Sequence, residues 1–278
     1  MQEINEQNFS GERAMFWCKD TRFSYCVFDE GESPLKHSQN LELNFTLFKW
    51  KYPLWYSKNA RLESCTFYEM ARAGVWYSSD IFFNQCTIEA PKNFRRSKNI
   101  TLQNVTLPNA AETLWSCENV TLKDVSARGD YFAMNSTNVS VENLNLAGNY
   151  SFDGVKNLEI KNSKIISKDA FWNSQNVTVT GSFISGEYLG WNSKNITFID
   201  CVIQSEQGMC YIDNVVLKNC KTINTNLAFE YSSVQAEISS GIDSVKNPIG
   251  GRIRAQNFGE VILEKDRIDP AKTQIEQI

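Results

Sequence analysis

Six charged residues in the middle of the chain carry most of the chemistry that this sequence offers. They are Glu112, Asp130, Asp153, Arg72, Lys92 and Arg95. Paired carboxylates serve as general acid and general base when a glycosidic bond is cleaved. Arginine and lysine form charge-assisted hydrogen bonds with acidic groups. We therefore predict that the three carboxylates are catalytic candidates and that the three cations hold an acidic group of a ligand.

A second set of residues extends this site along the chain. It consists of Tyr131, Tyr150, Lys168, Asp169 and Glu187. Tyrosine rings offer faces for sugar rings, and the charged members add polar contacts to a ligand. The alternative interpretation is a solvated face on which opposite charges pair with one another. For the group as a whole we favour a ligand-binding face, because charges and aromatic rings gather on the same side of the repeat.

The element that positions these residues is a repeat of about nineteen residues. An Asn or Asp recurs at Asn40, Asn59, Asp80, Asn99, Asn119, Asn138, Asn157, Asn176, Asn195 and Asn214. Apolar residues follow it at the first, third and eighth positions of most repeats, and a small or apolar residue such as cysteine often takes the sixth. Alternation of this kind is typical of short strands that bury one face. Asn tolerates the left-handed backbone of a corner, and stacked Asn amides bond to one another.

These observations predict an all-β protein, a right-handed parallel β-helix (solenoid). Nineteen residues allow three short strands and three turns, with about 12 coils in the chain. Helical repeats need thirty or more residues per unit, and a pentapeptide coil fits a steady nineteen poorly. We expect a single domain over residues 1–278, with coils over 20–263. Residues 1–19 and 264–278 would cap the two ends.

Two columns of residues define the candidate face. Their positions are counted back from the recurring Asn or Asp, which we call the ladder position. Four residues before the ladder position is a bulky column that includes Trp55, Trp76, Trp115, Trp172 and Trp191. We expect these rings to fill a corner of the coil. Arg95 and Asp153 interrupt this column, and an unpaired buried charge is costly. The polar residues lie mainly seven and eight positions before the ladder, so that successive coils bring them side by side.

The cysteines and the single histidine give no metal site. Cys26, Cys65, Cys86, Cys201 and Cys220 occupy the same inward position of the repeat, where a small apolar side chain fits. No cysteine–histidine spacing typical of zinc occurs, and His37 is the only histidine. We therefore expect core thiols, no metal and no cofactor.

Composition and charge exclude several other classes. The net charge is −4, which gives no bulk attraction to nucleic acid. There is no run of eighteen apolar residues and no basic start followed by an apolar stretch, so we expect neither a membrane helix nor a secretory leader. These features predict a cytoplasmic protein without nucleic-acid or membrane partners.

Several short phrases resemble those of a known family. They are GESPLK (31–36), YPLWYS (52–57), ARAGVWY (71–77), SKDAFWNS (167–174), GEYLGWNS (186–193) and SVKNP (244–248). The sequence is similar to an uncharacterised bacterial family of single-domain proteins related to the pectin-lyase-like β-helices. The resemblance implies the β-helix fold. It implies no activity, because fold does not carry function and the catalytic segments of the superfamily's enzymes are missing.

Three functions from different classes remain open at this point. The first is the binding or processing of a carbohydrate or glycoconjugate on the polar and aromatic face. The second is a non-catalytic structural or protein-interaction solenoid. The third, a nucleic-acid mimic, needs a strongly acidic face, and the basic residues Lys51, Arg72, Lys92 and Lys168 count against it. The partner that we favour is a saccharide or another small molecule with acidic groups.

Overall fold

The computed structural model describes residues 1–278 and consists of two compact units, Met1–Ser140 and Val141–Ile278. Each unit is a parallel β-solenoid. One strand, β13 (Thr137–Ala147), contains the boundary between the units. The predicted parallel β-helix with coils of about nineteen residues is confirmed.

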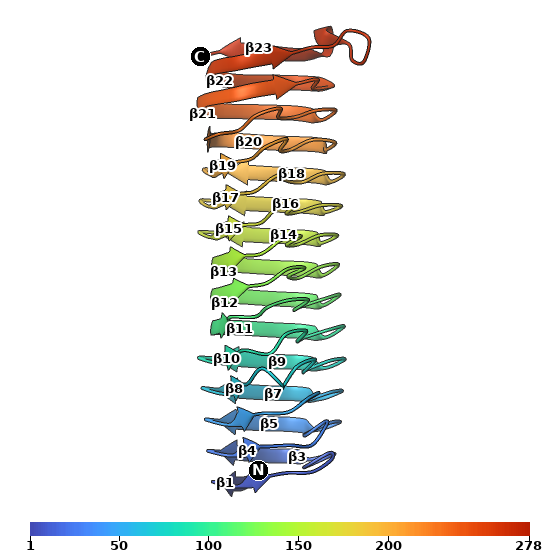
Figure 1. Cartoon of the computed structure of the whole chain (residues 1–278), viewed down its shortest axis with the longest axis vertical. Helices are drawn as coiled ribbons and strands as arrows, with labels where there is room; N and C mark the ends of the chain where they lie inside the picture. Colours follow the sequence, from blue (N-terminus) through green and yellow to red (C-terminus); the bar gives the residue numbers. More distant parts are fainter. The chain divides into compact units, whose positions relative to one another are not determined.

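The first unit stacks two rows of strands (Figure 1). The first row is β1 (Gln2–Asn5), β3 (Lys19–Ser24), β5 (Gln39–Asn44), β7 (Lys58–Glu63), β9 (Ser79–Asn84), β11 (Lys98–Leu107) and β12 (Glu118–Arg128). The second row is β2 (Asn8–Phe9), β4 (Val27–Phe28), β6 (Leu47–Phe48), β8 (Thr66–Phe67) and β10 (Thr87–Ile88), and β11 and β12 are long enough to serve both rows. Neighbouring strands pair in parallel and in register, as in Leu41↔Ala60 and Leu43↔Leu62.

The second unit repeats this arrangement. Its first row is β14 (Lys156–Lys161), β16 (Gln175–Thr180), β18 (Lys194–Ile199), β20 (Asp213–Thr222), β21 (Ser233–Lys246), β22 (Gly250–Ile262) and β23 (Thr273–Gln277). Its second row contains β15 (Lys164–Ile166), β17 (Phe183–Ser185) and β19 (Val202–Gln204), and a short 3-10 helix, η1 (Pro270–Lys272), precedes β23. No helix of the structure is long and apolar enough to cross a membrane.

The interior of each unit is built from the positions that the repeat predicts. In the coil of β5 and β6, Leu41, Leu43 and Phe48 are buried. Phe28, Phe48 and Phe67 stack on one another in successive coils, with ring centroids 5.1 and 4.5 Å apart. The five predicted core cysteines are buried, and all eight cysteines are free. Burial of these apolar columns is what stabilises the stack.

The ladder asparagines form the hydrogen-bonded column that their spacing predicts. Asn119 Nδ2 donates to Asn99 Oδ1 over 2.9 Å, and Asn138 Nδ2 donates to Asn119 Oδ1 over 3.0 Å. In the second unit, Asn176 bonds to Asn157 in the same way. Asn119 has a φ of 57°, a left-handed conformation that Asn adopts more readily than most residues. Most ladder positions therefore carry an amide that bonds to a neighbouring coil.

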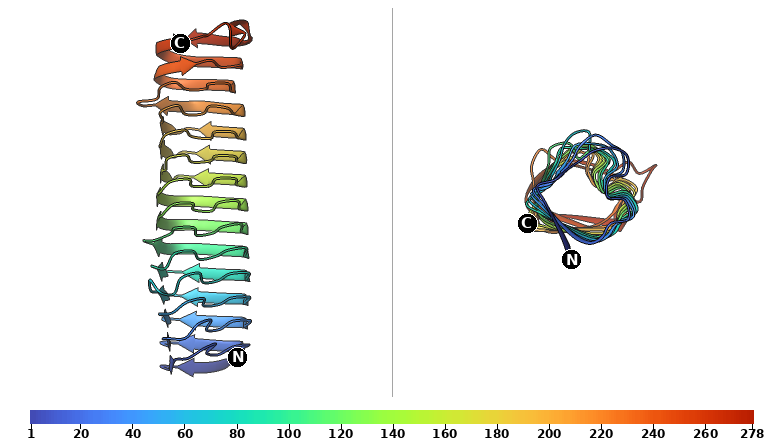
Figure 2. Two further views of the ribbon diagram at one scale, coloured as in Figure 1. Left: turned by 45° about the vertical axis from the view of Figure 1, so that its right-hand side comes forward. Right: turned by 90° about the horizontal axis from the view of Figure 1, so that it is seen from below.

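The third side of each coil is not a strand, which corrects the prediction of three strands per coil. Every second residue there has a positive φ, for example Tyr52 (65°), Leu54 (59°) and Tyr56 (55°). The N–H groups point alternately to the two neighbouring coils, since Tyr52 N donates to Arg72 O while Leu54 N donates to Pro34 O. Figure 2 shows this side as loops that close the outline of a coil around its interior. The loops keep their backbone hydrogen bonds without forming a sheet.

A ladder of buried serines, which the sequence reasoning missed, ties the third side to its neighbours. Ser97 Oγ accepts a hydrogen bond from Ser78 N over 3.0 Å and donates one to Val75 O over 2.6 Å. Ser193 makes the equivalent pair of bonds in the second unit, with Ser174 N and Phe171 O. Serine recurs two positions before the ladder asparagine, and each hydroxyl bridges two coils.

We expect Ser97→Ala to destabilise the first unit by about 1–2 kcal/mol, because Ser78 N would lose its partner in a buried place. The midpoint of urea unfolding, followed by circular dichroism, would measure the change. Ser126→Ala is the matched control, since Ser126 is an exposed residue of β12. Equal midpoints for Ser97→Ala and the wild type would show that the buried ladder contributes nothing to stability.

The coil count is higher than predicted, because the terminal segments also add strands. Within residues 1–19, β1 pairs with β3 and β2 pairs with β4 in the register of the other coils. At the other end, β23 pairs with β22 over Gly251↔Thr273 to Ala255↔Gln277. The predicted dozen coils is therefore too low. The single-domain organisation stays a prediction.

Candidate functional site

Three of the predicted site residues form one ionic cluster in the first unit. Lys92 Nζ lies 3.0 Å from Glu112 Oε1, and an N–H of Arg95 lies 2.8 Å from Glu112 Oε2. Lys92 and Glu112 come from the loops after β10 and β11, and Arg95 comes from the same loop as Lys92. The stacking of equivalent loops brings them together, as the repeat predicts. One carboxylate thus binds two cations.

Arg95 is also enclosed by two indoles, which accounts for a charge in a column of aromatic residues. Its guanidinium carbon lies 4.6 Å from the ring centroid of Trp76 and 4.8 Å from that of Trp115. Stacking of a guanidinium on indole faces is favourable and needs no further anion. Its Nε is buried and has no hydrogen-bond partner. Arg95 therefore continues the aromatic stack as a flat cation.

The surroundings of Glu112 decide its protonation. Burial raises the pKa of this carboxyl, but the hydrogen bonds and charges of Lys92 and Arg95 outweigh burial and hold the pKa below its ordinary value. A carboxylate that stays ionised at neutral pH has no proton to give, so Glu112 is unsuited to the role of general acid. Its present role is to fix Lys92 and Arg95.

The other predicted residues of the first unit lie around this cluster. Asp130 occupies the next coil, where its carbonyl oxygen accepts from Glu112 N over 2.9 Å, and its side chain is exposed. The ring of Tyr131 lies 6.2 Å from that of Trp115. Arg72 is exposed two loops before the coil of Glu112. These residues share a face with the cluster, as predicted.

Asp153, the third catalytic candidate, belongs to the second unit and ends a short amide ladder. Asn173 Nδ2 donates to Asp153 Oδ1 over 2.9 Å, and Asn192 Nδ2 donates to Asn173 Oδ1 over 2.8 Å. A carboxylate is a strong acceptor for the first amide of such a ladder. The ladder therefore explains the charge of Asp153, which the repeat alone did not. The three catalytic candidates do not lie in one unit.

Asp169 is the most deeply buried charged residue of the predicted set. The residue is 2% exposed, and its Oδ1 is buried without a hydrogen-bond partner. Burial raises the pKa of this carboxyl, and the charges of Glu187 and Asp153 raise it further, against the opposing effects of Lys168 and a hydrogen bond from Tyr150. A buried acceptor without a partner costs stability, which is typical of residues retained for another purpose.

Lys168 and Glu187 form an ion pair beside Asp169. Lys168 Nζ lies 3.1 Å from Glu187 Oε2, and both side chains are about half exposed. The same ammonium lies 5.6 Å from the ring centroid of Tyr188, and Trp191 packs edge-on against that ring at 5.3 Å. The ring of Tyr150 is likewise edge-on to Trp172. Neighbouring side chains therefore contact several of the tyrosine rings that were expected to stack on sugars.

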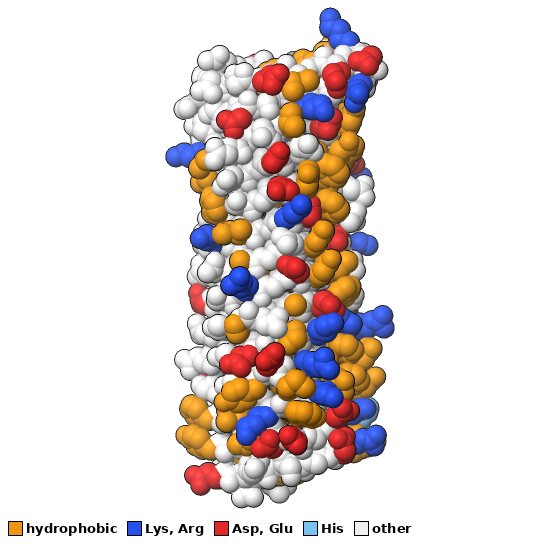
Figure 3. Space-filling view, in the orientation of Figure 1, with side chains coloured by type: hydrophobic (Ala, Val, Ile, Leu, Met, Phe, Trp, Pro, Cys, Tyr) orange, Lys and Arg blue, Asp and Glu red, His pale blue; other side chains and the backbone are white.

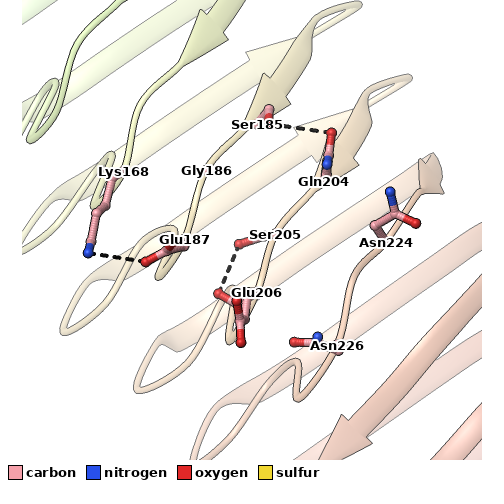
Figure 4. A pocket seen from close by; sticks show the side chains of 9 residues that line it. All are labelled: Lys168, Ser185, Gly186, Glu187, Gln204, Ser205, Glu206, Asn224 and Asn226. Carbon is pink, nitrogen blue, oxygen red and sulfur yellow. Dashed lines mark hydrogen bonds and ion pairs between the residues drawn. The ribbon is translucent and has the colours of Figure 1, made fainter.

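A polar pocket of about 420 Å³ opens next to this ion pair (Figure 4). It is lined by Lys168, Ser185, Gly186, Glu187, Gln204, Ser205, Glu206, Asn224 and Asn226. These residues lie at the ends of β15, β17, β19 and β20 and in the loops that follow them. Its volume falls within the range of small-molecule sites, although its lining is more polar than usual.

Three small residues take part in the lining of the pocket. Figure 4 shows Ser185 bonded to Gln204, Gly186 on the loop between Ser185 and Glu187, and Ser205 next to Glu206. A methyl group on Gly186 would collide with the backbone oxygen of Ser167 in the neighbouring coil. Glycine is therefore required for the close approach of two loops here.

Three residues give the pocket its binding chemistry. Glu206 forms no ion pair, so that it is the one carboxylate in the lining without a neutralising cation. The Oδ1 atom of Asn226 is buried and has no hydrogen-bond partner. Gln204 Oε1 accepts only a long bond of 3.4 Å from Ser185 Oγ. The lining of the pocket thus combines hydroxyl, amide and carboxylate groups.

The sequence reasoning found two of the nine residues that line this pocket. It named Lys168 and Glu187 but missed Glu206 and Asn226. Glu206 occupies the same place in its coil as Lys168 and Glu187 do in theirs, because Tyr188 N bonds to Glu206 O just as Asp169 N bonds to Glu187 O. Glu206 lies eight positions before Asn214, so following the polar residues at this position for one more repeat would have included it. No group of three or more His, Cys, Asp or Glu side chains is placed to hold a metal ion.

The parallel coils, the asparagine ladder and the polar third side define the chain as a parallel β-helix protein. It belongs to the family described as "Protein of unknown function (DUF3737)", whose model matches residues 2–276. This finding confirms the resemblance seen in the sequence. No curated protein sequence matches the chain.

Solved β-helix structures resemble the chain in fold. Two structures of PfbA, a surface adhesin of Streptococcus pneumoniae, match with TM-scores of 0.54 and 0.51 at 11% and 10% identity. The first match covers 83% of each chain, and the second covers 99% of this chain and 91% of the adhesin. A tailspike protein of E. coli bacteriophage HK620 in complex with pentasaccharide matches with a TM-score of 0.43 at 12% identity, over 92% of this chain and 62% of the tailspike. At these identities the likeness to PfbA shows the fold alone.

Proposed function

We propose that the protein binds a neutral saccharide in the polar pocket of the second unit. The observation that carries the proposal is the lining itself, which combines two serine hydroxyls, three side-chain amides and one carboxylate without an ion pair. A polyhydroxylated ligand both donates and accepts hydrogen bonds, and this set of groups matches it.

The charges of the pocket favour a neutral ligand over an acidic one. Lys168 is already paired with Glu187, which leaves the negative charge of Glu206 uncompensated. An acidic ligand would be repelled by Glu206 and would have to displace Glu187 from Lys168. The proposal therefore narrows the expected saccharide to a neutral one.

The proposal concerns binding alone. The pocket also contains two carboxyl groups, those of Glu187 and Glu206, which raises the question of whether a bound sugar is cleaved. Glu187 and Glu206 occupy equivalent places in adjacent coils, which lie about 4.8 Å apart in a parallel stack. Retaining glycosidases cleave with two carboxyl groups roughly 5–5.5 Å apart, whereas the coil spacing gives only the separation of the two backbones. Chromatography of each sugar after incubation with the protein would detect cleavage.

The test is isothermal titration calorimetry with neutral oligosaccharides of glucose, xylose and N-acetylglucosamine, and with an oligogalacturonate as the acidic comparison. We expect at least one neutral sugar to bind, and Glu206→Gln and Asn226→Ala to weaken its binding about tenfold, the effect of one good hydrogen bond. Lys161→Ala is the control, because Lys161 is an exposed residue of β14 outside the lining. Binding of the acidic sugar alone, or unchanged affinity in both pocket variants, would refute the proposal.

A further inference from the structure

The first unit carries an exposed strip of aromatic and basic side chains that the proposed function does not use. The aromatic–basic strip consists of Phe16, Trp17, Lys36, His37, Trp55, Tyr56, Trp76, Tyr77, Arg95 and Arg96. Each coil adds two adjacent residues to it, just before the first strand of the next coil. Figure 3 shows hydrophobic and basic side chains, with some acidic ones among them, along one edge of this unit.

The rings of the strip stack on one another along the coils. Tyr56 stacks on Tyr77 at 5.0 Å and 10°, and on His37 at 4.9 Å and 10°. Beside them, Trp55 stacks on Trp76 at 5.1 Å and 7°. Because the faces cover each other, the rings present mainly their edges to solvent. The edge of an aromatic ring is its positive part, so that a row of edges favours acceptors and anions.

The charged members of the strip have the same sign. Lys36 lies 5.7 Å from the ring centroids of Trp55 and Tyr56 and forms no ion pair with a carboxylate. Arg96 is exposed and likewise forms no ion pair. The strip contains no Asp or Glu, and the one carboxylate bound to it is Glu112, which pairs with Arg95. Ring edges and cations together make this surface attractive to carboxylates.

The strip also exposes more apolar surface than a solvated face requires. Trp17 is 60% exposed, Tyr56 43% and Tyr77 37%. Tryptophan, tyrosine and arginine are the side chains that most often anchor protein–protein interfaces. They lose little side-chain entropy on binding, and here the stacking already fixes them.

We propose that the aromatic–basic strip docks an acidic, extended segment of a partner protein. Its carboxylates meet the ring edges and the cations Lys36 and Arg96, and its apolar side chains cover Trp17, Tyr56 and Tyr77. Single-stranded nucleic acid fits less well, because base stacking needs free ring faces, and the inner rings of this strip have none. This interaction lies in the other unit from the polar pocket and does not depend on the saccharide proposal.

The experiment measures fluorescence anisotropy of a labelled peptide of about twelve residues in which Glu and Val alternate. We expect Arg96→Glu to weaken binding about tenfold or more, because it reverses one of the two charges of the strip that form no ion pair, and Trp17→Ala to weaken it about fivefold through lost contact area. Lys123→Glu is the matched control: it makes the same charge change on β12, outside the strip, and should alter the affinity by less than about twofold. Circular dichroism of each variant checks its folding.

Two further probes distinguish the outcomes. A peptide with Lys in place of Glu should not bind, and an oligothymidylate of similar charge should bind more weakly than the acidic peptide. Equal binding of the Lys peptide, tighter binding of the oligothymidylate, or an equal loss in Lys123→Glu and Arg96→Glu would each overturn the proposal. Trp17→Ala keeps the inference testable if Arg96→Glu does not fold.

Discussion

Gly186→Ala is expected to destabilise the second unit by on the order of 3 kcal/mol and to abolish binding in the polar pocket. The new methyl group would overlap the backbone oxygen of Ser167 in the neighbouring coil. That oxygen belongs to the main chain and cannot rotate away, so the two loops must separate, and close packing resists this. Separation also moves Glu187 and Lys168, which line the pocket on either side of the contact.

Urea unfolding and calorimetry with the neutral sugars measure the two effects of Gly186→Ala. Gly250→Ala is the control, because a methyl group there would meet nothing closer than 3.7 Å. The control should unfold at the midpoint of the wild type and bind sugar normally. An unchanged midpoint for Gly186→Ala would mean that the loops tolerate a wider spacing. Retained sugar binding in a destabilised variant would show that binding does not depend on the close contact between Gly186 and Ser167.

The sequence predicts the two β-sides well because burial determines their register. Shifting a strand such as β5 by one residue would expose Leu41 and Leu43 and bury their charged or polar neighbours. The apolar period therefore identifies the inward positions without a structure. The ladder asparagines add a second, independent marker of the corners. Together they also predict which residues of successive coils become neighbours, as with Glu112 and Lys92.

The third side could not be predicted in the same way. Its conformation places residues such as Leu54 and Val75 at φ values of 59° and 57°, where such side chains are uncommon. Local preference opposes this backbone, and hydrogen bonds from both neighbouring coils impose it. The prediction of a third strand on this side was wrong. The sequence shows no apolar alternation there that would have indicated the backbone conformation.

The charged residues show what the repeat reveals and what it leaves open. The repeat marked Arg95 and Asp153 as exceptions, but only the structure shows that Arg95 lies between two indoles and that Asp153 ends an amide ladder. The pocket was missed for a different reason. Its lining includes the small residues Ser185, Gly186 and Ser205, and small side chains give no positive signal of a hollow in the sequence.

Asp169 connects the pocket to a property of the whole second unit, its stability as a function of pH. Its carboxyl is buried, with one oxygen that has no hydrogen-bond partner. Burial raises the pKa in the folded protein above the ordinary value of 3.8. The folded protein therefore holds this proton more tightly than the unfolded chain does. Stability from this group is fully present below about pH 3.8 and is lost as the pH rises through the folded pKa.

Asp169→Asn should accordingly stabilise the second unit at neutral pH, by about 1–3 kcal/mol, because the amide is never ionised in its buried place. The gain should shrink as the pH falls toward the ordinary pKa of 3.8, because below it the wild-type carboxyl becomes protonated in the folded and the unfolded chain alike. Urea unfolding between pH 4 and 8 measures both the gain in stability at neutral pH and its decrease toward acidic pH. Asp243→Asn, at an exposed carboxylate of β21, should leave the pH dependence unchanged. A gain that does not vary with pH would show that Asp169 does not titrate in this range. A loss of stability at pH 7 would mean that its ionised form is held by the surrounding groups, and the cost of burial would then not be the dominant effect at this position.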